Sequence, residues 1–197
     1  MYKRQHNNCS GKHCGFLAVG AARGLDVAGY TNASHPIMRE VTDAISLLTG
    51  VKLDKTQACV DGCAIPAFSM PLVSVATGFA RLGTGEGLSP VFARSVERIR
   101  SAIVQNPIML SGEGRFDTCV TAECQGEVFV KSGAEGVMVA SISALGYGLA
   151  VKINDGAHRA ATAVMAELLS HVLQKHSLVS TRAIEMLKGY ACFQLKN

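Results

Sequence analysis

The sequence of 197 residues predicts an α/β protein of the α+β kind, with a sheet flanked by helices, and three observations point to this fold class. Apolar residues recur at helical spacing through the first half of the chain. From Glu127 onward the period changes, and three β-rich runs follow one another between glycine turns. A long Ala-rich segment comes next. Because no repeat and no linker separates these parts, residues 1–197 are predicted to form a single domain.

Hydrophobic periodicity and end signals predict five helices, over residues 12–24, 38–48, 71–82, 89–104 and 158–174. Gly24 and Gly50 are suited to end the first two helices, because glycine tolerates the left-handed conformation there. Ser89 before Pro90 is a good N-cap for the fourth helix. In the last helix the expected apolar stripe consists of Val164, Leu168 and Val172.

The β-rich runs "VFVKSG", "GVMVASIS" and "GLAVKIN" are close neighbours in sequence, which predicts a three-stranded antiparallel meander. The segment "QACVDGCAIP" at 57–66 contains a turn at Asp61-Gly62 and stops at Pro66, so a loop after a short strand is expected. The polar, Gly-rich segment "SGEGRFDT" at 111–118 is expected to form a loop that leads into a short helix before Gly126.

Composition narrows the class of function. A hydrophobic content of 48% and a charged content of 17% indicate an extensive core. The net charge of +4 is scattered, aromatic residues make up 6%, and tryptophan is missing, so nucleic-acid binding has little support. The sequence has no long apolar run and no signal-peptide pattern. A cytoplasmic protein without membrane association is therefore expected. The seven cysteines are expected to be reduced thiols.

The segment "CSGKH" is a candidate metal site. Cys9 and Lys12 have the spacing of a metal knuckle, and the turn "VDGC" could add Cys63, with Cys59 and His13 in reserve. Thiolate ligands favour zinc over hard ions such as magnesium.

Two other interpretations of "CSGKH" remain open. It could be a helix-capping turn in which Ser10 satisfies backbone donors and the cysteines pack as small apolar groups. It could also hold a nucleophile, Ser10 or Cys9, at the positive end of a helix, with His13 or Lys12 as the base. A further hypothesis makes Cys63 or Cys9 a thiol nucleophile.

The tripeptide Lys131-Ser132-Gly133 ends a predicted strand. It is similar to the Lys-Thr/Ser-Gly element of serine β-lactamases and penicillin-binding proteins, in which the lysine lies beside the nucleophile. The alternative is an exposed lysine at a strand edge before a turn.

Six segments, in order, resemble the bacterial L-asparaginase II family of the rhizobial type: "NNCSGKHCGFLA", "HP" at 35–36, "DGCAIPAF", "GEGRFDT", "KSGAEG" and "AVKINDG". The resemblance runs along nearly the whole chain. It implies hydrolysis of L-asparagine to L-aspartate and ammonia on a serine β-lactamase-like fold, in a homodimer.

The resemblance also implies roles for single residues. Cys9, Lys12 and Cys63 are expected to hold a zinc ion, and His13 and Asp61 are expected to lie near the substrate. Lys131 is expected to pair with a serine in catalysis.

One element of the family is missing from the sequence. Members carry a Ser-x-x-Lys element in a further N-terminal segment, which supplies the attacking serine, and no Ser-x-x-Lys tetrapeptide occurs here. The chain is therefore expected to be the C-terminal portion of such an enzyme, with the N-terminal part of the fold missing and activity alone incomplete or absent. The alternative function is a non-catalytic zinc-binding structural or assembly module.

Overall fold

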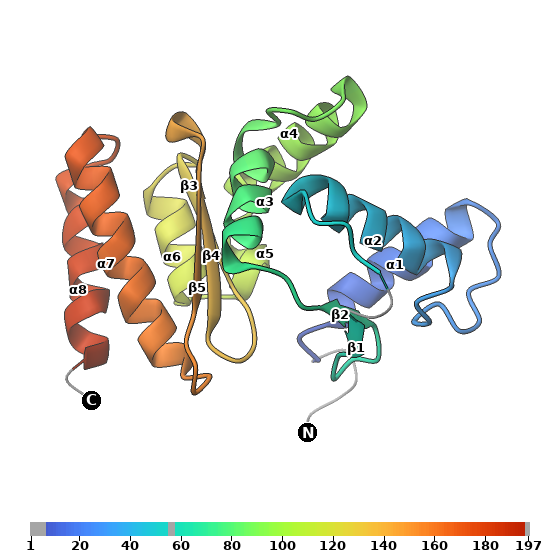
Figure 1. Ribbon diagram of the computed structural model, residues 1–197. Coiled ribbons are helices and arrows are strands. Elements are labelled where there is room, and N and C mark those ends of the chain that lie inside the picture. The colour runs from blue at the N-terminus through green and yellow to red at the C-terminus, as the bar shows by residue number, and fades with distance from the viewer. Residues whose placement is uncertain (1–6, 55–57, 196–197) are drawn as a thin grey trace. The chain divides into compact units, whose positions relative to one another are not determined.

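The computed structural model describes residues 7–54 and 58–195, and the chain forms two compact units, Met1–Met70 and Pro71–Asn197 (Figure 1). Helices predominate, together with two small antiparallel sheets. This confirms the predicted α+β class. The single domain expected over residues 1–197 stays a prediction.

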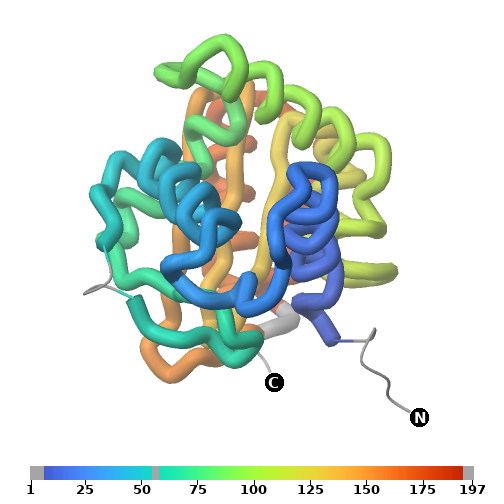
Figure 2. The backbone as a smooth tube through the Cα atoms, turned by 90° about the vertical axis from the view of Figure 1, so that its right-hand side faces the viewer, coloured from blue at the N-terminus to red at the C-terminus, as the bar shows by residue number. Residues whose placement is uncertain are grey.

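The first unit contains two helices and a hairpin: α1 (Ser10–Ala22), α2 (Pro36–Thr49), β1 (Ala58–Val60) and β2 (Pro66–Phe68). Figure 2 shows their path from blue to blue-green. Ile37, Met38 and Ile65 form the buried core, and Phe16 and Val41 pack against it. The α2 helix ends at Gly50, which has a φ of 73°, as the sequence predicts.

The segment 57–66 differs from its prediction. Where a loop after one short strand is expected, the described residues form an antiparallel hairpin in which Ala58 pairs with Phe68 and Val60 with Pro66. The turn at Asp61-Gly62 is present, but Pro66 opens a strand instead of ending the segment. Proline is accepted there because it is the first residue of a strand in a two-stranded sheet, where a missing N–H costs little.

The second unit holds the rest of the chain. Its elements are α3 (Leu72–Thr84), α4 (Pro90–Gln105), α5 (Ile108–Ser111), α6 (Phe116–Glu123), β3 (Val128–Ser132), β4 (Val137–Ile142), η3 (Ser143–Leu145), β5 (Tyr147–Lys152), α7 (His158–His176) and α8 (Thr181–Leu195). The predicted meander is confirmed, with strand order β3-β4-β5 and antiparallel pairing throughout. The α3 helix lies on one face of the sheet and α7 on the other, with α8 packed behind α7 (Figure 1).

The contact between α3 and the sheet depends on Gly148 in β5. A Cβ atom added there would lie 1.8 Å from the carbonyl oxygen of Ala76 and 2.5 Å from the backbone nitrogen of Ala80, both in α3. Both neighbours are backbone atoms, which cannot rotate away. The helix therefore approaches the strand as closely as it does only because the residue facing it has no side chain.

The buried face of α7 is not the one predicted. Val164 and Leu168 are 42% and 40% exposed, whereas Met165, Leu169 and Leu173, one position further along, are fully buried. Both stripes are apolar with the same helical spacing, so the spacing alone does not predict which one is buried. The buried stripe is determined by the sheet and by α8, which pack against α7. No helix in the described residues combines the length and the apolar character that a membrane span requires.

The N-cap prediction for α4 is confirmed, since the Ser89 hydroxyl accepts a hydrogen bond from the backbone N–H of Phe92. The α5 and α8 helices have no counterpart among the helices predicted from the sequence.

Candidate functional site

A group of four side chains, which we call the thiol cluster, lies in the first unit and consists of Cys9, Lys12, Asp61 and Cys63. Cys9 is the N-cap of α1, and Lys12 follows one turn later. Asp61 and Cys63 lie in the β1–β2 turn, where the Asp61 N–H donates to the Ile65 carbonyl. Helix start and hairpin turn thus bring together residues about fifty positions apart.

The distances within the thiol cluster are short. The Lys12 Nζ lies 3.5 Å from the Cys63 Sγ. The Cys63 thiol donates to the Asp61 carboxylate at 2.9 Å. One ligand atom each from Cys9, Asp61 and Cys63 lie within 4.8 Å of one another. The three residues expected to hold zinc therefore converge, and the carboxylate of Asp61 lies among them.

Electrostatics couple Asp61 to Cys63. Hydrogen bonds from the Cys63 thiol and backbone N–H, helped by the charge of Lys12, lower the pKa of Asp61. Burial, and then the hydrogen bond to Asp61, raise the pKa of Cys63. A raised pKa lowers the thiolate fraction of Cys63 at neutral pH, which counts against Cys63 as a free nucleophile.

The donors in the thiol cluster suit zinc. Two thiols, a carboxylate and an amine offer the sulfur, oxygen and nitrogen ligands that this ion accepts in a tetrahedral site. A dication would take the place of the thiol protons, because metal binding to cysteine releases them.

The reserve ligands are engaged elsewhere. The exposed Cys59 thiol donates to the Ala67 carbonyl within the hairpin. Cys9 occupies the N-cap of α1, and its thiol makes no capping hydrogen bond.

His13, expected near the substrate, is held by an aromatic pair. Its Nδ1 is joined to the Tyr30 hydroxyl by a hydrogen bond of 2.6 Å, and the Phe16 ring packs edge-on against it. The other ring nitrogen, Nε2, is buried and has no hydrogen-bond partner among the described residues. Nothing in the sequence pattern singles out Tyr30, which lies in a turn between two helices.

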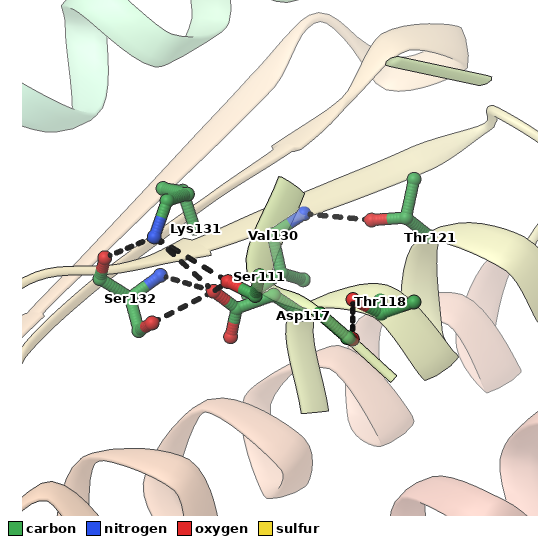
Figure 3. Close-up of polar contacts among 8 residues, drawn as sticks. Ser111, Asp117, Thr118, Thr121, Val130, Lys131 and Ser132 are labelled. Carbon is green, nitrogen blue, oxygen red and sulfur yellow. Dashed lines mark hydrogen bonds and ion pairs between the residues drawn. The ribbon is translucent and has the colours of Figure 1, made fainter. Parts of the chain in front are cut away.

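A second group, which we call the lysine cluster, lies in the second unit and consists of Ser111, Asp117, Lys131 and Ser132 (Figure 3). One oxygen of Asp117 accepts hydrogen bonds from the Ser111 hydroxyl at 2.6 Å, the Ser132 hydroxyl at 2.7 Å and the Ser132 N–H at 2.8 Å. The Lys131 Nζ lies 3.5 Å from that oxygen and donates to the Ser132 carbonyl at 2.7 Å.

The lysine cluster is placed by the packing of α6 along the edge strand β3. Thr121 and Asp117, one helical turn apart, accept from the N–H groups of Val130 and Ser132, two residues apart in the strand. The spacings match, since four helical residues rise about 6 Å and two strand residues about 6.6 Å. Thr118 fixes the preceding loop by donating to the Gly112 carbonyl at 2.7 Å.

Asp117 is 2% exposed, and burial alone would raise its pKa. Hydrogen bonds from Ser111 and Ser132 and the charge of Lys131 outweigh burial, so the pKa of Asp117 lies below its usual range. The Lys131 side chain, 43% exposed, thus sits against a buried carboxylate at the strand edge. Sequence reasoning missed Ser111 and Asp117, although both lie in the "SGEGRFDT" segment, because a polar loop gives no sign of which strand it will meet.

The family model described as L-asparaginase II matches residues 2–196 of the chain. A search of curated proteins found no match.

Proposed function

The chain belongs to the L-asparaginase II family, and we propose that it takes part in the hydrolysis of the side-chain amide of L-asparagine, giving L-aspartate and ammonia. The observation that carries this proposal is the lysine cluster, in which the Lys131 ammonium is fixed at the end of a strand by the Ser132 carbonyl and lies 3.5 Å from the Ser111 hydroxyl. Serine–lysine amide hydrolysis uses a fixed cation of this kind to stabilise the negative charge that develops in the reaction.

In this reaction a serine hydroxyl attacks the amide carbon, ammonia leaves after receiving a proton, and water hydrolyses the resulting ester. Lys131 contributes positive charge and an N–H donor where negative charge develops. Ser111 and Ser132 do not attack, because both donate to Asp117, a carboxylate with a lowered pKa and thus a weak proton acceptor. The attacking serine is assigned to a Ser-x-x-Lys element, which residues 1–197 do not contain.

We assign zinc to Cys9, Lys12 and Cys63. A zinc ion held by these residues would supply Lewis-acid chemistry. Lys12 must lose its proton to ligate, which a neighbouring dication promotes. Asp61 offers a negative charge that suits the α-ammonium group of asparagine, and His13 offers its unpartnered Nε2.

Ammonia release from L-asparagine tests the proposed reaction. It is measured for the purified chain and for a form extended through the upstream reading frame, with L-glutamine in parallel. In whichever form is active, Lys131→Met is expected to lower kcat by about 10²–10³, the cost of removing a charge-stabilising donor.

Lys152→Met is the matched control. Lys152 also ends a strand of the sheet and donates to the carbonyl of the next residue, Ile153, but has no carboxylate within ion-pair distance among the described residues. It is expected to keep the activity within about twofold of the parent. Absence of ammonia release from both forms would contradict the proposed reaction.

A second candidate function is a zinc-stabilised structural or assembly module. It is favoured by the position of the thiol cluster, which links the start of α1 to the β1–β2 turn. This candidate predicts one zinc per chain, a melting temperature that rises with zinc, and no amide hydrolysis in any form.

Cys63→Ser separates zinc binding from general thiol effects. It is expected to abolish the zinc-dependent rise in melting temperature, whereas Cys59→Ser, whose thiol only donates to the Ala67 carbonyl, is expected to retain it. Equal zinc binding by both variants and the parent would remove the thiol cluster from both candidate functions.

A further inference from the structure

The Lys131 ammonium is held from two directions. The carbonyl of Ser132 accepts one hydrogen bond at 2.7 Å, and the Ser111 hydroxyl and the Asp117 carboxylate lie at 3.5 Å on the other side. Figure 3 shows these groups converging on the nitrogen. The partner that carries a full charge is Asp117.

The carboxylate of Asp117 is itself rigidly placed. It lies in the first turn of α6, where the helix dipole favours negative charge, and one of its oxygens accepts three hydrogen bonds. Two of these come from the backbone and side chain of Ser132, the residue next to Lys131. The position of the carboxylate is therefore tied to the same stretch of β3 that carries the lysine.

We infer that Asp117 is a positioning residue for Lys131, which holds the ammonium in one place at the end of β3. Its consequence for catalysis rests on the proposed function: Lys131 serves as a fixed cationic hydrogen-bond donor and not as the base that takes a proton from the nucleophile. Ser111 and Ser132 act through Asp117 by fixing its carboxylate.

The effect of Asp117 on Lys131 can be measured by chemical labelling of the lysine, which does not require an active enzyme. Asp117→Asn removes the charged partner that holds the Lys131 amine in place, so the rate at which acetic anhydride labels Lys131 at pH 8 is expected to rise by about two- to fivefold, as for a partly exposed ion pair.

Cleavage after glutamate isolates the reporter and its control. Residues 128–135 contain Lys131 as their only lysine, and residues 136–167 contain only Lys152. The ratio of the two labelling rates corrects for reagent and for general loosening. An unchanged ratio in Asp117→Asn would overturn the inference, and so would an equal rise at both lysines.

Ser111→Ala separates charge from packing. It removes one hydrogen bond to Asp117 but keeps the carboxylate, so the labelling ratio is expected to change by less than about twofold. A rise as large as that of Asp117→Asn would show that the hydroxyl, and not the carboxylate charge, holds Lys131.

A reciprocal experiment covers the case in which Asp117→Asn does not fold. Lys131→Met changes a partly exposed side chain, and by linkage the same coupling acts on Asp117. The titration midpoint of the Asp117 carboxyl carbon, followed by NMR, is expected to rise relative to the parent, because the positive charge of Lys131 helps to lower the pKa of Asp117. No rise would overturn the inference.

In an active form, Asp117→Asn is expected to lower kcat with little change in KM and to alter the pH profile, and Asp117→Glu to restore part of kcat. If no form hydrolyses asparagine, the proposed function fails, while the labelling and NMR results still decide whether Asp117 positions Lys131.

Discussion

Replacing Gly148 by alanine tests the packing of α3 on the sheet. The added Cβ would lie 1.8 Å from the Ala76 carbonyl oxygen, whereas non-bonded atoms in contact lie about 3.5 Å apart, so α3 must move by about 1.7 Å. Because Gly148 has no positive φ, the substitution adds a contact without adding backbone strain. Overpacking of this kind costs about 1–3 kcal/mol, and backbone neighbours put the expected loss at the upper end.

Gly189→Ala is the matched control for the same chemical change. Gly189 lies inside α8, where an added Cβ meets nothing within 4 Å. Alanine there is expected to stabilise the protein by about 0.5–1 kcal/mol, since glycine is the weaker helix former. The free energy of unfolding is measured by urea denaturation followed by circular dichroism. A Gly148→Ala variant as stable as the parent would refute the close packing of α3 on β5.

Three further outcomes follow from the fold. Leu169→Ala, at a fully buried position of α7, is expected to cost about 2–5 kcal/mol of unfolding free energy, while Leu168→Ala, at a 40% exposed position, costs clearly less; equal losses in urea melts would contradict the assigned face. Ser89→Ala is expected to cost about 1 kcal/mol, because it removes the N-cap of α4, and Ser89→Thr is expected to retain most of that stability. Asp117 has a folded-state pKa below its ordinary value of 3.8, so its ionisation stabilises the fold above pH 3.8, and this contribution is lost as the pH falls through the folded-state pKa. The difference in unfolding free energy between the parent and Asp117→Asn is therefore expected to shrink from pH 7 to pH 2. A constant difference would refute the ionic contribution.

Local signals were sufficient to predict most of the elements. Gly50 ends α2 in the left-handed conformation, and Ser89 caps α4, because these effects depend only on neighbours in sequence. The meander could also be predicted from the sequence, because short glycine-bearing connections favour pairing of adjacent strands.

The buried face of α7 needed information from the rest of the molecule. Leu168 and Leu169 are both leucines on apolar stripes, and which one is buried depends on where the sheet and α8 lie. The prediction of a loop at 57–66 was wrong for a related reason. A strand as short as β2 forms because it pairs with β1, and three residues are too few to show the alternating pattern of a strand.

The candidate site divides in the same way. The convergence of Cys9 with Cys63 follows a pattern in the residue types themselves, and the geometry agrees with it. The partners of Lys131 and His13 do not follow any such pattern. Asp117 reaches Lys131 only because α6 packs along β3, and Tyr30 reaches His13 only because the turn after α1 folds back. Contacts of this kind are tertiary and leave no local trace.

The hydrogen bonds from Val130 and Ser132 to the side chains of α6 also decide how the sheet can grow. They occupy N–H groups on the outer edge of β3, so a further strand has no free ladder to join on that side. Among the described residues, the outer edge of β5 (Tyr147–Lys152) pairs with no strand. Any segment that extends this sheet, whether from a second copy or from another part of the polypeptide, therefore has to add beside β5.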